Sequence, residues 1–434
     1  MTNCLTFFQT VFLRFHLPKS GKIWIFIILL TCFLSVTIIK KFLFICCRGL
    51  SQSADISPAN ITLELIHTKD KKVLLIPKKD YSNGMLDMYF NGNARSTCNL
   101  DFNCQFSSSQ LLKNAKKLSR YDLIVIGENR GMRTMLQFIR EKDYSKWRSK
   151  DQLWAYFGVE SSQRPTPYLL GAEKEYQNAF NWTVFASPRA TIYRPFWYIR
   201  ESTKETRKQS KQLISGLKSR RKDVCWIFSN CFTDFSRRIE YATEFIRHFG
   251  GSFHIWGDAI GDCLSGSTWK KKVKSHGTID ERKEDIYSPQ QNKMKDCKFY
   301  FAFENSVCED YVTEKFVNAL SGGAIPIVNG WRATYEKNLP GSFIHVSDFS
   351  SPASLAKYIE DLSKNKTAML SYHHWRNQKR IDPAKIESIC EMCNRMKTID
   401  NQKAMGIDVK PEVISDPVKT IQRLQTCMTP NRKA

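Results

Sequence analysis

A cluster of polar side chains follows one strongly apolar segment in the second half of the chain. The run KFYFAF, residues 298–303, is followed by side chains that carry a charge or form hydrogen bonds: Glu304, Asn305, Tyr311, Glu314 and Lys315. A helical pattern begins here, and the start of a helix attracts anions through its unpaired N–H groups and its dipole. An ammonium for a phosphate, a carboxylate for a sugar hydroxyl and an aromatic ring for a base together suit a nucleoside diphosphate sugar. Singly, each residue is equally typical of a helix cap, a solvated surface or a core.

The elements that must position this cluster are short apolar runs separated by helical patterns. Most of the runs are continuous rather than alternating, which is typical of strands buried on both faces of a parallel sheet. They are residues 122–127, 153–159, 180–186, 224–229, 252–256, 298–303, 324–328 and 343–346. Between them, residues 236–250 carry apolar side chains at helical spacing up to Gly250. The alternation predicts α/β layers, in which ligands bind beyond the carboxyl ends of the strands.

Length and charge narrow the class of protein. At 434 residues the chain exceeds one ordinary core, so two globular domains are expected. The formal net charge of +24 fits nucleic acid, an anionic membrane, a phosphorylated substrate or a solvated basic surface. The most basic tract, residues 204–222, has no interleaved aromatic side chains for base stacking, so we interpret it as a solvent-facing helix or linker. A second basic stretch, residues 269–293, has the composition of a long surface loop.

An uncharged apolar segment near the N-terminus predicts a membrane anchor. Residues 23–39 contain no charge, and lysines flank the segment on both sides. Its length reaches the lower limit for a transmembrane helix, about 17 residues, whereas a cleaved signal peptide would have a shorter apolar core and a small-residue cleavage site. We therefore expect a cytoplasmic tail (residues 1–22), a transmembrane signal-anchor (residues 23–45) and a lumenal stem (residues 46–75).

Three N-glycosylation sequons indicate the orientation of this anchor. Basic residues are nearly balanced on its two sides, so the positive-inside rule does not decide. The acceptor residues Asn60, Asn181 and Asn365 all lie beyond the span, as expected if that part of the chain faces the lumen. The prediction is a single-pass type II membrane protein.

Ten of the fourteen cysteines lie at or after residue 98, in the globular part of the chain, which favours disulfides in an oxidising compartment. Cys390 and Cys393 form a C-x-x-C pair, and a zinc site would normally need a second pair at suitable spacing. Pairing them with Cys98 and Cys104 would instead join the start of the globular part to its end. Cys225 and Cys297 each precede an apolar run and could bridge neighbouring strands. In a cytosolic protein the same residues would be thiols or metal ligands.

The polar cluster stands within a longer string that resembles the sequences of one enzyme family. The string FAFENSVCEDYVTEK, with NAL, GGAIPIV and Gly330 after it, is similar to the donor-binding signature of the α1,3/α1,4-fucosyltransferases, Golgi enzymes that transfer fucose from GDP-fucose. Further stretches agree in order over about residues 90–395: VESSQRP, FNWTVFASPRATIYRPF, WIFSNCFTDFSRR, FHIWGDAIGDC and the final C-x-x-C.

This resemblance implies a fold and a domain order. The fold would be GT-B-like, with two facing Rossmann-like, doubly wound α/β domains preceded by one N-terminal transmembrane helix. The acceptor-side domain would span residues 76–215 and the GDP-fucose-binding domain residues 216–365. Residues 366–434 would form C-terminal helices that pack back across the chain. The location would be the Golgi membrane, with the catalytic part in the lumen.

The implied reaction is an inverting displacement at fucose C1, which needs a general base for the acceptor hydroxyl. Glu160 is the candidate, because it follows the apolar run 153–159 and matches the glutamate of the family's E-S-P segment. Ser162 stands where the family usually has proline, which leaves the shape of this loop open. Two further departures are Gly127, where the family often has histidine, and Cys308 within the long signature.

The departing diphosphate also needs fixed cations. Arg237 matches the family's phosphate-contacting arginine, Arg238 beside it could fill the same role, and Lys315 is the second cation. The resemblance makes Asn305, Tyr311 and Glu314 further donor-binding residues, whereas Glu304 could equally support the loop. No metal is required on this view, and stimulation by Mn or Mg stays open. The chain has no D-x-D triplet, Walker A motif or G-x-G-x-x-G fingerprint.

The predicted function is transfer of L-fucose from GDP-fucose, in α1,3 linkage, to N-acetylglucosamine of glycoprotein or glycolipid glycans. A GDP-sugar transferase with another linkage or acceptor, or a non-catalytic membrane-tethered glycan-binding relative, are the alternatives. Retention of Glu160, Arg237 and Lys315 together argues for activity. The predicted partners are GDP-fucose, the glycan acceptor and the lipid bilayer, with no nucleic acid. The sequence does not distinguish core N-acetylglucosamine from outer-chain lactosamine or LacdiNAc.

Overall fold

The structure, a computed structural model, describes most of the chain after residue 68. The described residues are 69–76, 92–108, 115–128, 130–141, 143–163, 169–228, 235–256, 279–280, 294–384, 386–410 and 412–428. Among them, no helix combines the length and the apolar character that crossing a bilayer requires. The predicted tail, signal-anchor and Asn60 sequon, and most of the basic stretch 269–293, lie outside these residues.

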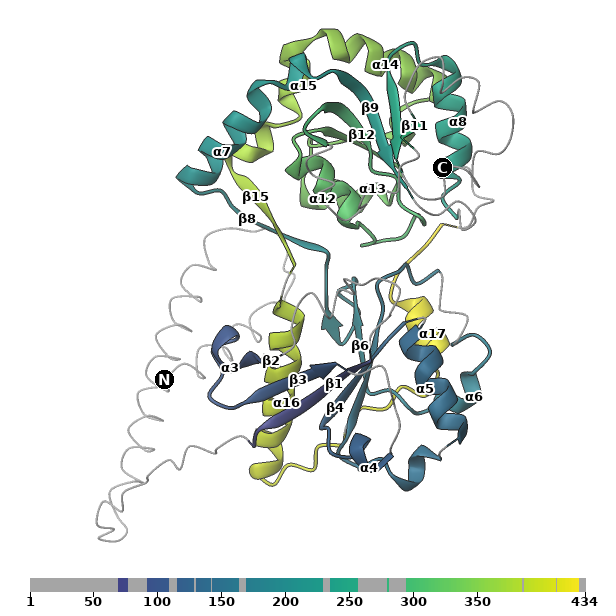
Figure 1. The fold of residues 1–434 in the computed structure, drawn as a ribbon, viewed down its shortest axis with the longest axis vertical. Helices are drawn as coiled ribbons and strands as arrows, with labels where there is room; N and C mark the ends of the chain where they lie inside the picture. Colours follow the sequence, from purple (N-terminus) through teal and green to yellow (C-terminus); the bar gives the residue numbers. More distant parts are fainter. Residues whose placement is uncertain are drawn as a thin grey trace, which may run out of the picture. The chain divides into compact units, whose positions relative to one another are not determined.

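The first sheet has seven strands in the order β2-β3-β1-β4-β5-β6-β7 (Figure 1). They are β1 (Lys71–Ile76), β2 (Gly92–Asn93), β3 (Cys104–Ser108), β4 (Leu123–Gly127), β5 (Leu153–Phe157), β6 (Trp182–Phe185) and β7 (Ile192–Tyr193). All neighbours pair in parallel except β2 and β3. The accompanying helices are α3 (Ala94–Thr97), α4 (Ala115–Leu118), α5 (Arg130–Glu141) and α6 (Glu173–Tyr176). Side chains of β4 and β5 are buried along their whole length, as their continuous apolar runs predict.

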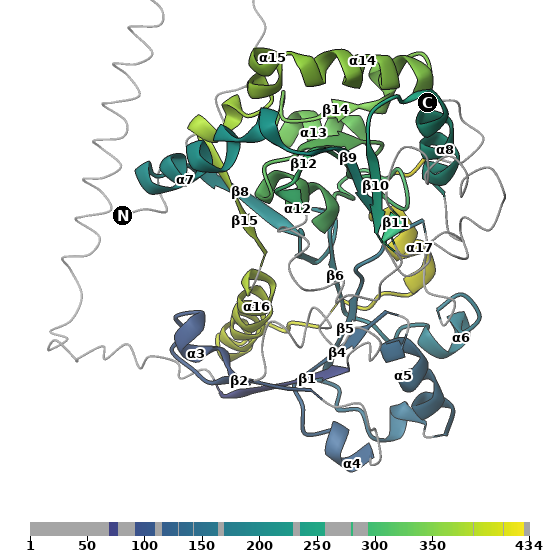
Figure 2. The same ribbon diagram turned by 45° about the horizontal axis from the view of Figure 1, so that its top comes forward.

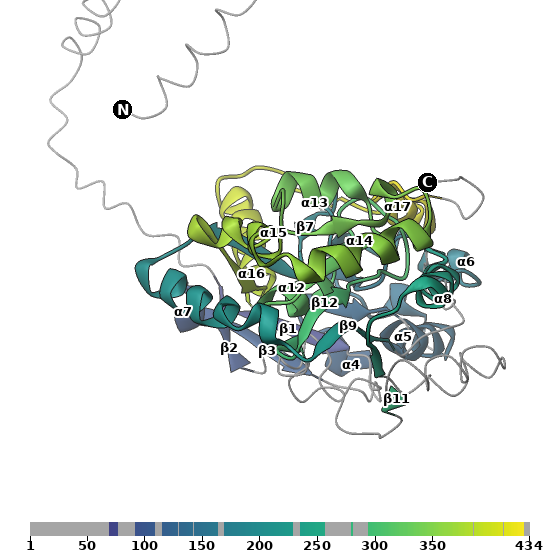
Figure 3. The same cartoon turned by 90° about the horizontal axis from the view of Figure 1, so that it is seen from above.

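The second sheet has six parallel strands in the order β11-β10-β9-β12-β13-β14. They are β9 (Lys222–Ile227), β10 (Phe253–Trp256), β11 (Ile279–Asp280), β12 (Cys297–Phe301), β13 (Ile325–Val328) and β14 (Ile344–His345). The helices are α8 (Arg238–His248), α12 (Glu314–Ser321), α13 (Arg332–Asn338), α14 (Pro352–Lys364) and α15 (Lys366–Ser371), and α14 and α15 lie over the sheet when it is seen from above (Figure 3). The predicted α/β layers are therefore confirmed in both halves.

The chain passes from the first sheet to the second and back again through paired strands and helices. Strand β8 (Trp197–Glu201) leads from the first sheet to helix α7 (Lys204–Ser215), and β15 (Lys379–Pro383) pairs with β8 in the antiparallel direction on the way back. Helix α16 (Glu387–Ala404) then lies beside the first sheet (Figure 2). Its residues Ile389, Met392 and Met396 are buried in the core of that sheet. Helix α17 (Pro417–Arg423) follows and contributes Ile421 to the core on the sheet's other face.

The disulfides predicted for six cysteines are present. Cys98 bonds to Cys390 and Cys104 to Cys393, which ties α16 to α3 and β3 across sequence separations of 292 and 289 residues. The third, Cys225–Cys297, joins the neighbouring strands β9 and β12. A fourth disulfide, Cys308–Cys427, was not foreseen from the sequence.

Two sequence-based assignments are wrong. Strand β1 overlaps the predicted stem (residues 46–75) at residues 71–75, yet it pairs with both β3 and β4 near the centre of the first sheet. The run KVLLI is short and follows polar residues and lysines, so its pattern alone does not indicate a strand of the sheet. The first residue of β1, Lys71, is buried with its ammonium 2.7 Å from the carboxylate of Asp400.

The second correction concerns Asn181, which the structure buries. Its Oδ1 accepts hydrogen bonds from the backbone N–H of Trp154 at 2.9 Å and from Arg148 at 2.7 Å, and its Nδ2 donates to the carbonyl of Glu412 at 3.0 Å. A glycan on this nitrogen has no space in the folded chain. Asn365 is exposed, because it caps α15 through its Oδ1 and leaves its amide nitrogen in solvent.

Loss of one disulfide should measurably destabilise the fold. Cys98 and Cys390 are both partly exposed, so replacing them with serine leaves little strain in the core. For Cys98→Ser combined with Cys390→Ser we expect the free energy of unfolding to fall by about 2–5 kcal/mol, because the bridge closes a very long loop. Chemical denaturation of the variant and the unmodified chain measures this. An unchanged midpoint would show that the neighbouring Cys104–Cys393 bridge alone holds α16.

Candidate active site

The polar loop after β12, residues 304–313, is called the donor loop below, and the buried carboxylate of Glu304 holds it in place. Glu304 has no exposed surface. Its Oε1 accepts the backbone N–H of Thr313 at 2.7 Å and its Oε2 accepts the Thr313 hydroxyl at 2.8 Å. Burial raises the pKa of Glu304, and the ammonium of Lys315 opposes that rise. The carboxylate thus ties the end of the donor loop to the strand where the loop begins.

Lys315 is the second residue of α12, so its charge lies at the positive end of that helix. Its Nζ is 3.1 Å from Glu304 Oε2, 2.8 Å from the Thr313 hydroxyl and 3.3 Å from Glu314 Oε1. Burial favours the neutral amine, but the carboxylates of Glu304 and Glu314 raise the pKa of Lys315 above its usual value. The side chain is only 15% exposed and remains an ammonium at neutral pH.

Glu160 from the first sheet meets Tyr311 from the donor loop. The Tyr311 hydroxyl donates to Glu160 Oε2 at 3.1 Å. Glu160 follows β5 by three residues and is partly exposed, whereas the Tyr311 ring is 2% exposed. Burial and the Glu160 carboxylate raise the pKa of the Tyr311 phenol, which keeps its proton and remains a donor. The ring therefore offers no open face for stacking a base, contrary to the sequence interpretation, and its hydroxyl instead orients a carboxylate.

The two arginines at the start of α8 differ in their environment. Arg237 has left-handed backbone angles (φ 53°) and a side chain 63% exposed, and its Nε donates to Glu240 at 2.6 Å. Arg238 is 2% exposed, donates to the carbonyl of Phe303 at 3.3 Å, and lowers the pKa of Lys315 through its charge. The structure thus places Arg238, rather than Arg237, beside Lys315. The sequence analysis names Arg237 first and Arg238 as its alternative, because the two positions are adjacent and chemically identical; the structure shows that their environments differ.

Asn305 and Glu314 complete the predicted set. Asn305 is partly buried in the turn after Glu304, and Glu314 begins α12 with its side chain 54% exposed. Both lie within the segment that holds Tyr311 and Lys315. Within the described residues, no group of three or more His, Cys, Asp or Glu side chains is arranged to hold a metal ion.

A buried carboxylate that the sequence analysis missed supports the Glu160 loop. Glu128 directly follows β4 and is 4% exposed. Its Oε1 accepts the backbone N–H of Glu160 at 2.9 Å, and its Oε2 accepts the Tyr156 hydroxyl at 3.4 Å. The rule that singled out Glu304, a polar residue at the carboxyl end of a buried strand, would also have found Glu128.

Comparison with known proteins gives a family match in the second half of the chain. Residues 217–411 match the family described as "Glycosyltransferase family 10 (fucosyltransferase) C-term". The chain is 32% identical over 259 residues to the mouse (Mus musculus) 4-galactosyl-N-acetylglucosaminide 3-alpha-L-fucosyltransferase 9, which covers 59% of this chain and 62% of that protein. It is 31% identical over 260 residues to the mouse alpha-(1,3)-fucosyltransferase 4, which covers 59% of this chain and 54% of that protein. The match thus spans less than two thirds of either relative.

Among solved structures, the crystal structure of an alpha1,3-fucosyltransferase with GDP superposes with a TM-score of 0.45. The sequence identity is 13%, and the superposition covers 83% of this chain and 94% of that chain. The structure of Anabaena HepE in complex with UDP and glucose gives a TM-score of 0.44 at 12% identity, over 77% of this chain and 99% of that chain.

Replacement of Glu128 should loosen the Glu160 loop, and this effect can be measured on the protein without any ligand. In Glu128→Ala the Glu160 N–H loses its acceptor, and a lost buried hydrogen bond to a charged group costs about 1.5–3 kcal/mol. We expect amide exchange at Glu160 to become at least about tenfold faster. Hydrogen-exchange mass spectrometry measures this, and Glu128→Gln, which keeps an acceptor oxygen, is the matched control. Equal protection in Glu128→Ala and the unmodified chain would mean that other contacts hold the loop.

Proposed function

We propose, because residues 217–411 match glycosyltransferase family 10, that the chain belongs to this family and transfers L-fucose from GDP-fucose, in α1,3 linkage, to N-acetylglucosamine of glycoprotein or glycolipid glycans. The observation that carries this proposal is the hydrogen bond between Tyr311 and Glu160. It brings a carboxylate suited to general-base catalysis next to the segment that carries the donor signature. The names of the two relatives make a 4-galactosyl-N-acetylglucosaminide the first acceptor to test.

In the proposed reaction Glu160 accepts the proton of the acceptor hydroxyl. The freed oxygen forms a bond to fucose C1 while the bond from C1 to the diphosphate oxygen breaks, and GDP leaves with the electron pair of that bond. A partly exposed carboxylate that accepts one hydrogen bond from Tyr311 keeps its second oxygen for the incoming hydroxyl.

The departing diphosphate gains negative charge, which Lys315 and Arg238 stabilise in this proposal. Both cations are largely buried, so their charges act in surroundings of low dielectric constant. Glu304 holds Lys315 beside the start of α12, with Lys315 Nζ 3.1 Å from Glu304 Oε2. These cations supply the charge that a divalent metal provides in other nucleotide-sugar enzymes, and Asn305 and Glu314 are the proposed further donor contacts.

The proposal extends to the cellular setting. We propose a GT-B arrangement in which the second sheet binds the donor and the first faces the acceptor, in a single-pass type II protein of the Golgi membrane anchored by residues 23–45. The disulfides are consistent with an oxidising lumen. With β1 reassigned, the acceptor-side domain begins before residue 71 and the stem is shorter than residues 46–75.

Replacement of the proposed base should separate binding from chemistry. Glu160→Gln keeps the shape of the side chain and an acceptor for the Tyr311 hydroxyl but cannot take a proton. We expect GDP affinity to change less than about threefold and the rate of transfer to fall by roughly 100- to 10,000-fold. Calorimetry with GDP and product formation from GDP-fucose measure the two quantities. Normal turnover by this variant would exclude Glu160 as the base.

A matched pair of substitutions decides which arginine binds the diphosphate. Arg238→Met, which fills a similar volume without charge, should weaken GDP binding by about 10- to 100-fold, because it removes charge-assisted hydrogen bonds to phosphate. Arg237→Met should leave the GDP affinity nearly unchanged, since that side chain is exposed and paired with Glu240. Titration calorimetry with GDP measures both. The opposite order would restore the assignment made from the sequence.

A further inference from the structure

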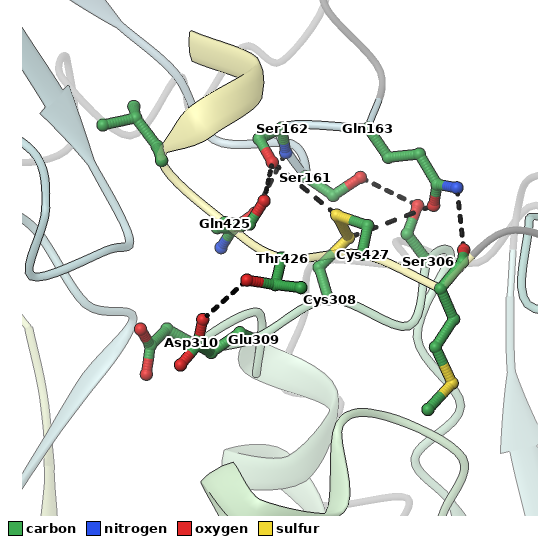
Figure 4. The surroundings of a disulfide bond; sticks show 12 residues. Ser161, Ser162, Gln163, Ser306, Cys308, Glu309, Asp310, Gln425, Thr426 and Cys427 are labelled. Carbon is green, nitrogen blue, oxygen red and sulfur yellow. Dashed lines mark hydrogen bonds between the residues drawn. A yellow bond between two sulfur atoms is a disulfide. The ribbon is translucent and has the colours of Figure 1, made fainter. Parts of the chain in front are cut away.

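Two departures from the family pattern meet at the C-terminal end of the described chain. Ser162 stands in place of proline in the E-S-P segment, and Cys308 lies inside the long donor signature. Both contact residues 424–428, the segment after α17, which we call the C-terminal strap (Figure 4). The strap runs between residues 160–163, called the base loop, and the donor loop.

The strap holds the base loop by hydrogen bonds that a proline would prevent. The backbone N–H of Ser162 donates to Gln425 Oε1 at 2.9 Å, and the Ser162 hydroxyl donates to the Gln425 carbonyl at 3.4 Å. Gln163 Nε2 donates to the carbonyl of Met428 at 2.9 Å. Proline has no N–H, so the shortest of the Ser162 bonds exists only because this chain departs from the pattern.

The same strap is fixed to the donor loop by a covalent bond and by backbone pairing. Cys308 and Cys427 form a disulfide and also an antiparallel β-bridge. On either side of it, the Glu309 N–H donates to the Thr426 carbonyl at 2.8 Å and the Met428 N–H donates to the Val307 carbonyl at 2.9 Å. The strap therefore adds a short strand to the donor loop, three residues before Tyr311.

The two loops also touch each other beside the strap. The Ser161 hydroxyl donates to the Ser306 hydroxyl at 2.8 Å, and both residues are buried. Arg189, which follows β6, forms an ion pair with Glu309 at 2.7 Å, and the Thr426 hydroxyl donates to the same Glu309 carboxylate at 3.1 Å. The base loop, the donor loop and the strap thus form one connected network.

We propose that the C-terminal strap is a positioning element of the active site, which fixes the Glu160 carboxylate relative to Tyr311 and Lys315. The proposal rests on the proposed function. Glu160 stands two residues before Ser162, and Tyr311 stands three residues after Cys308. The strap therefore binds both loops close to Glu160 and Tyr311. A misplacement of about 1 Å can lower a reaction rate about 100-fold, so these contacts matter for turnover even though none of them touches the substrate.

A purely stabilising strap would behave differently from a positioning strap. If the strap only strengthened the fold, its loss would lower the melting temperature and leave kcat of the folded fraction unchanged. A positioning strap predicts a lower kcat at nearly constant GDP affinity, because the strap contacts the donor loop at residues 307–309, whereas Glu304 and Thr313 are the residues of that loop that hold Lys315. The change in kcat of the folded protein, compared with the change in GDP affinity, therefore distinguishes a positioning strap from a stabilising one.

The sharpest test is a pair of substitutions at Ser162 in the full-length protein. Ser162→Pro removes the hydroxyl and also the N–H that binds Gln425, whereas Ser162→Ala removes only the hydroxyl, with its 3.4 Å hydrogen bond to the Gln425 carbonyl and its 3.6 Å contact with Cys427 Sγ. We expect Ser162→Pro to lower kcat about 10- to 100-fold with a change in GDP affinity below about threefold, and Ser162→Ala to lower kcat less than about threefold. Equal kcat values for Ser162→Pro and the unmodified chain would overturn the proposal.

A second pair tests the disulfide. Cys308→Ser with Cys427→Ser frees the strap from the donor loop, and Cys225→Ser with Cys297→Ser removes a bridge inside the second sheet as a control for general destabilisation. We expect the first pair to lower kcat about tenfold or more at a temperature where both variants are folded, and the second pair to leave it within about threefold. Equal effects of the two pairs would assign the strap to stability alone.

Amide exchange separates failure of this inference from failure of the proposed function. If the unmodified chain transfers no fucose from GDP-fucose to any N-acetylglucosamine acceptor, the proposed function is wrong, and exchange still tests the strap. Faster exchange at residues 160–163 in Ser162→Pro, but not in Ser162→Ala, would support a strap that orders the base loop. Unchanged exchange in both variants would overturn it.

Discussion

The hydrogen bond from the Tyr311 hydroxyl to the Glu160 carboxylate is the contact on which the rest of the site depends, because it joins the loops of two different sheets. Each partner is backed by a buried carboxylate that follows a buried strand. Glu128 after β4 accepts the backbone N–H of Glu160, and Glu304 after β12 accepts the backbone N–H of Thr313. In both sheets, therefore, a buried glutamate after a strand accepts a backbone N–H of the loop that follows, and so fixes that loop.

Burial of charge in this way is costly unless the charges have partners, and the pair of Glu304 and Lys315 meets that condition. Glu304 is fully buried but accepts hydrogen bonds from Thr313 and Lys315, and the two opposite charges stand 3.1 Å apart. Arg238 brings a second buried cation near Lys315. The charge of Arg238 lowers the pKa of Lys315, but the nearby carboxylates of Glu304 and Glu314 raise it more, so Lys315 remains an ammonium.

Much of the fold followed from local pattern, because strands buried on both faces appear in the sequence as continuous apolar runs. The polar cluster after β12 predicted the candidate site described above. What the sequence could not supply was the environment of individual side chains. Arg237 and Arg238 are indistinguishable until the left-handed turn at Arg237 sends one side chain outward. The sequon at Asn181 is complete as a motif, yet its amide belongs to the core. Cys308–Cys427 joins residues 119 positions apart, a pairing that spacing alone does not reveal.

A crystal structure of the protein with GDP tests most directly whether the cluster after β12 binds a nucleotide diphosphate facing Glu160. We predict phosphate oxygens within hydrogen-bond distance of Lys315 Nζ and the Arg238 guanidinium, with the terminal phosphate directed toward the Glu160 carboxylate. GDP bound away from Lys315, or bound there with Glu160 turned out of reach of the terminal phosphate, would contradict the proposed site.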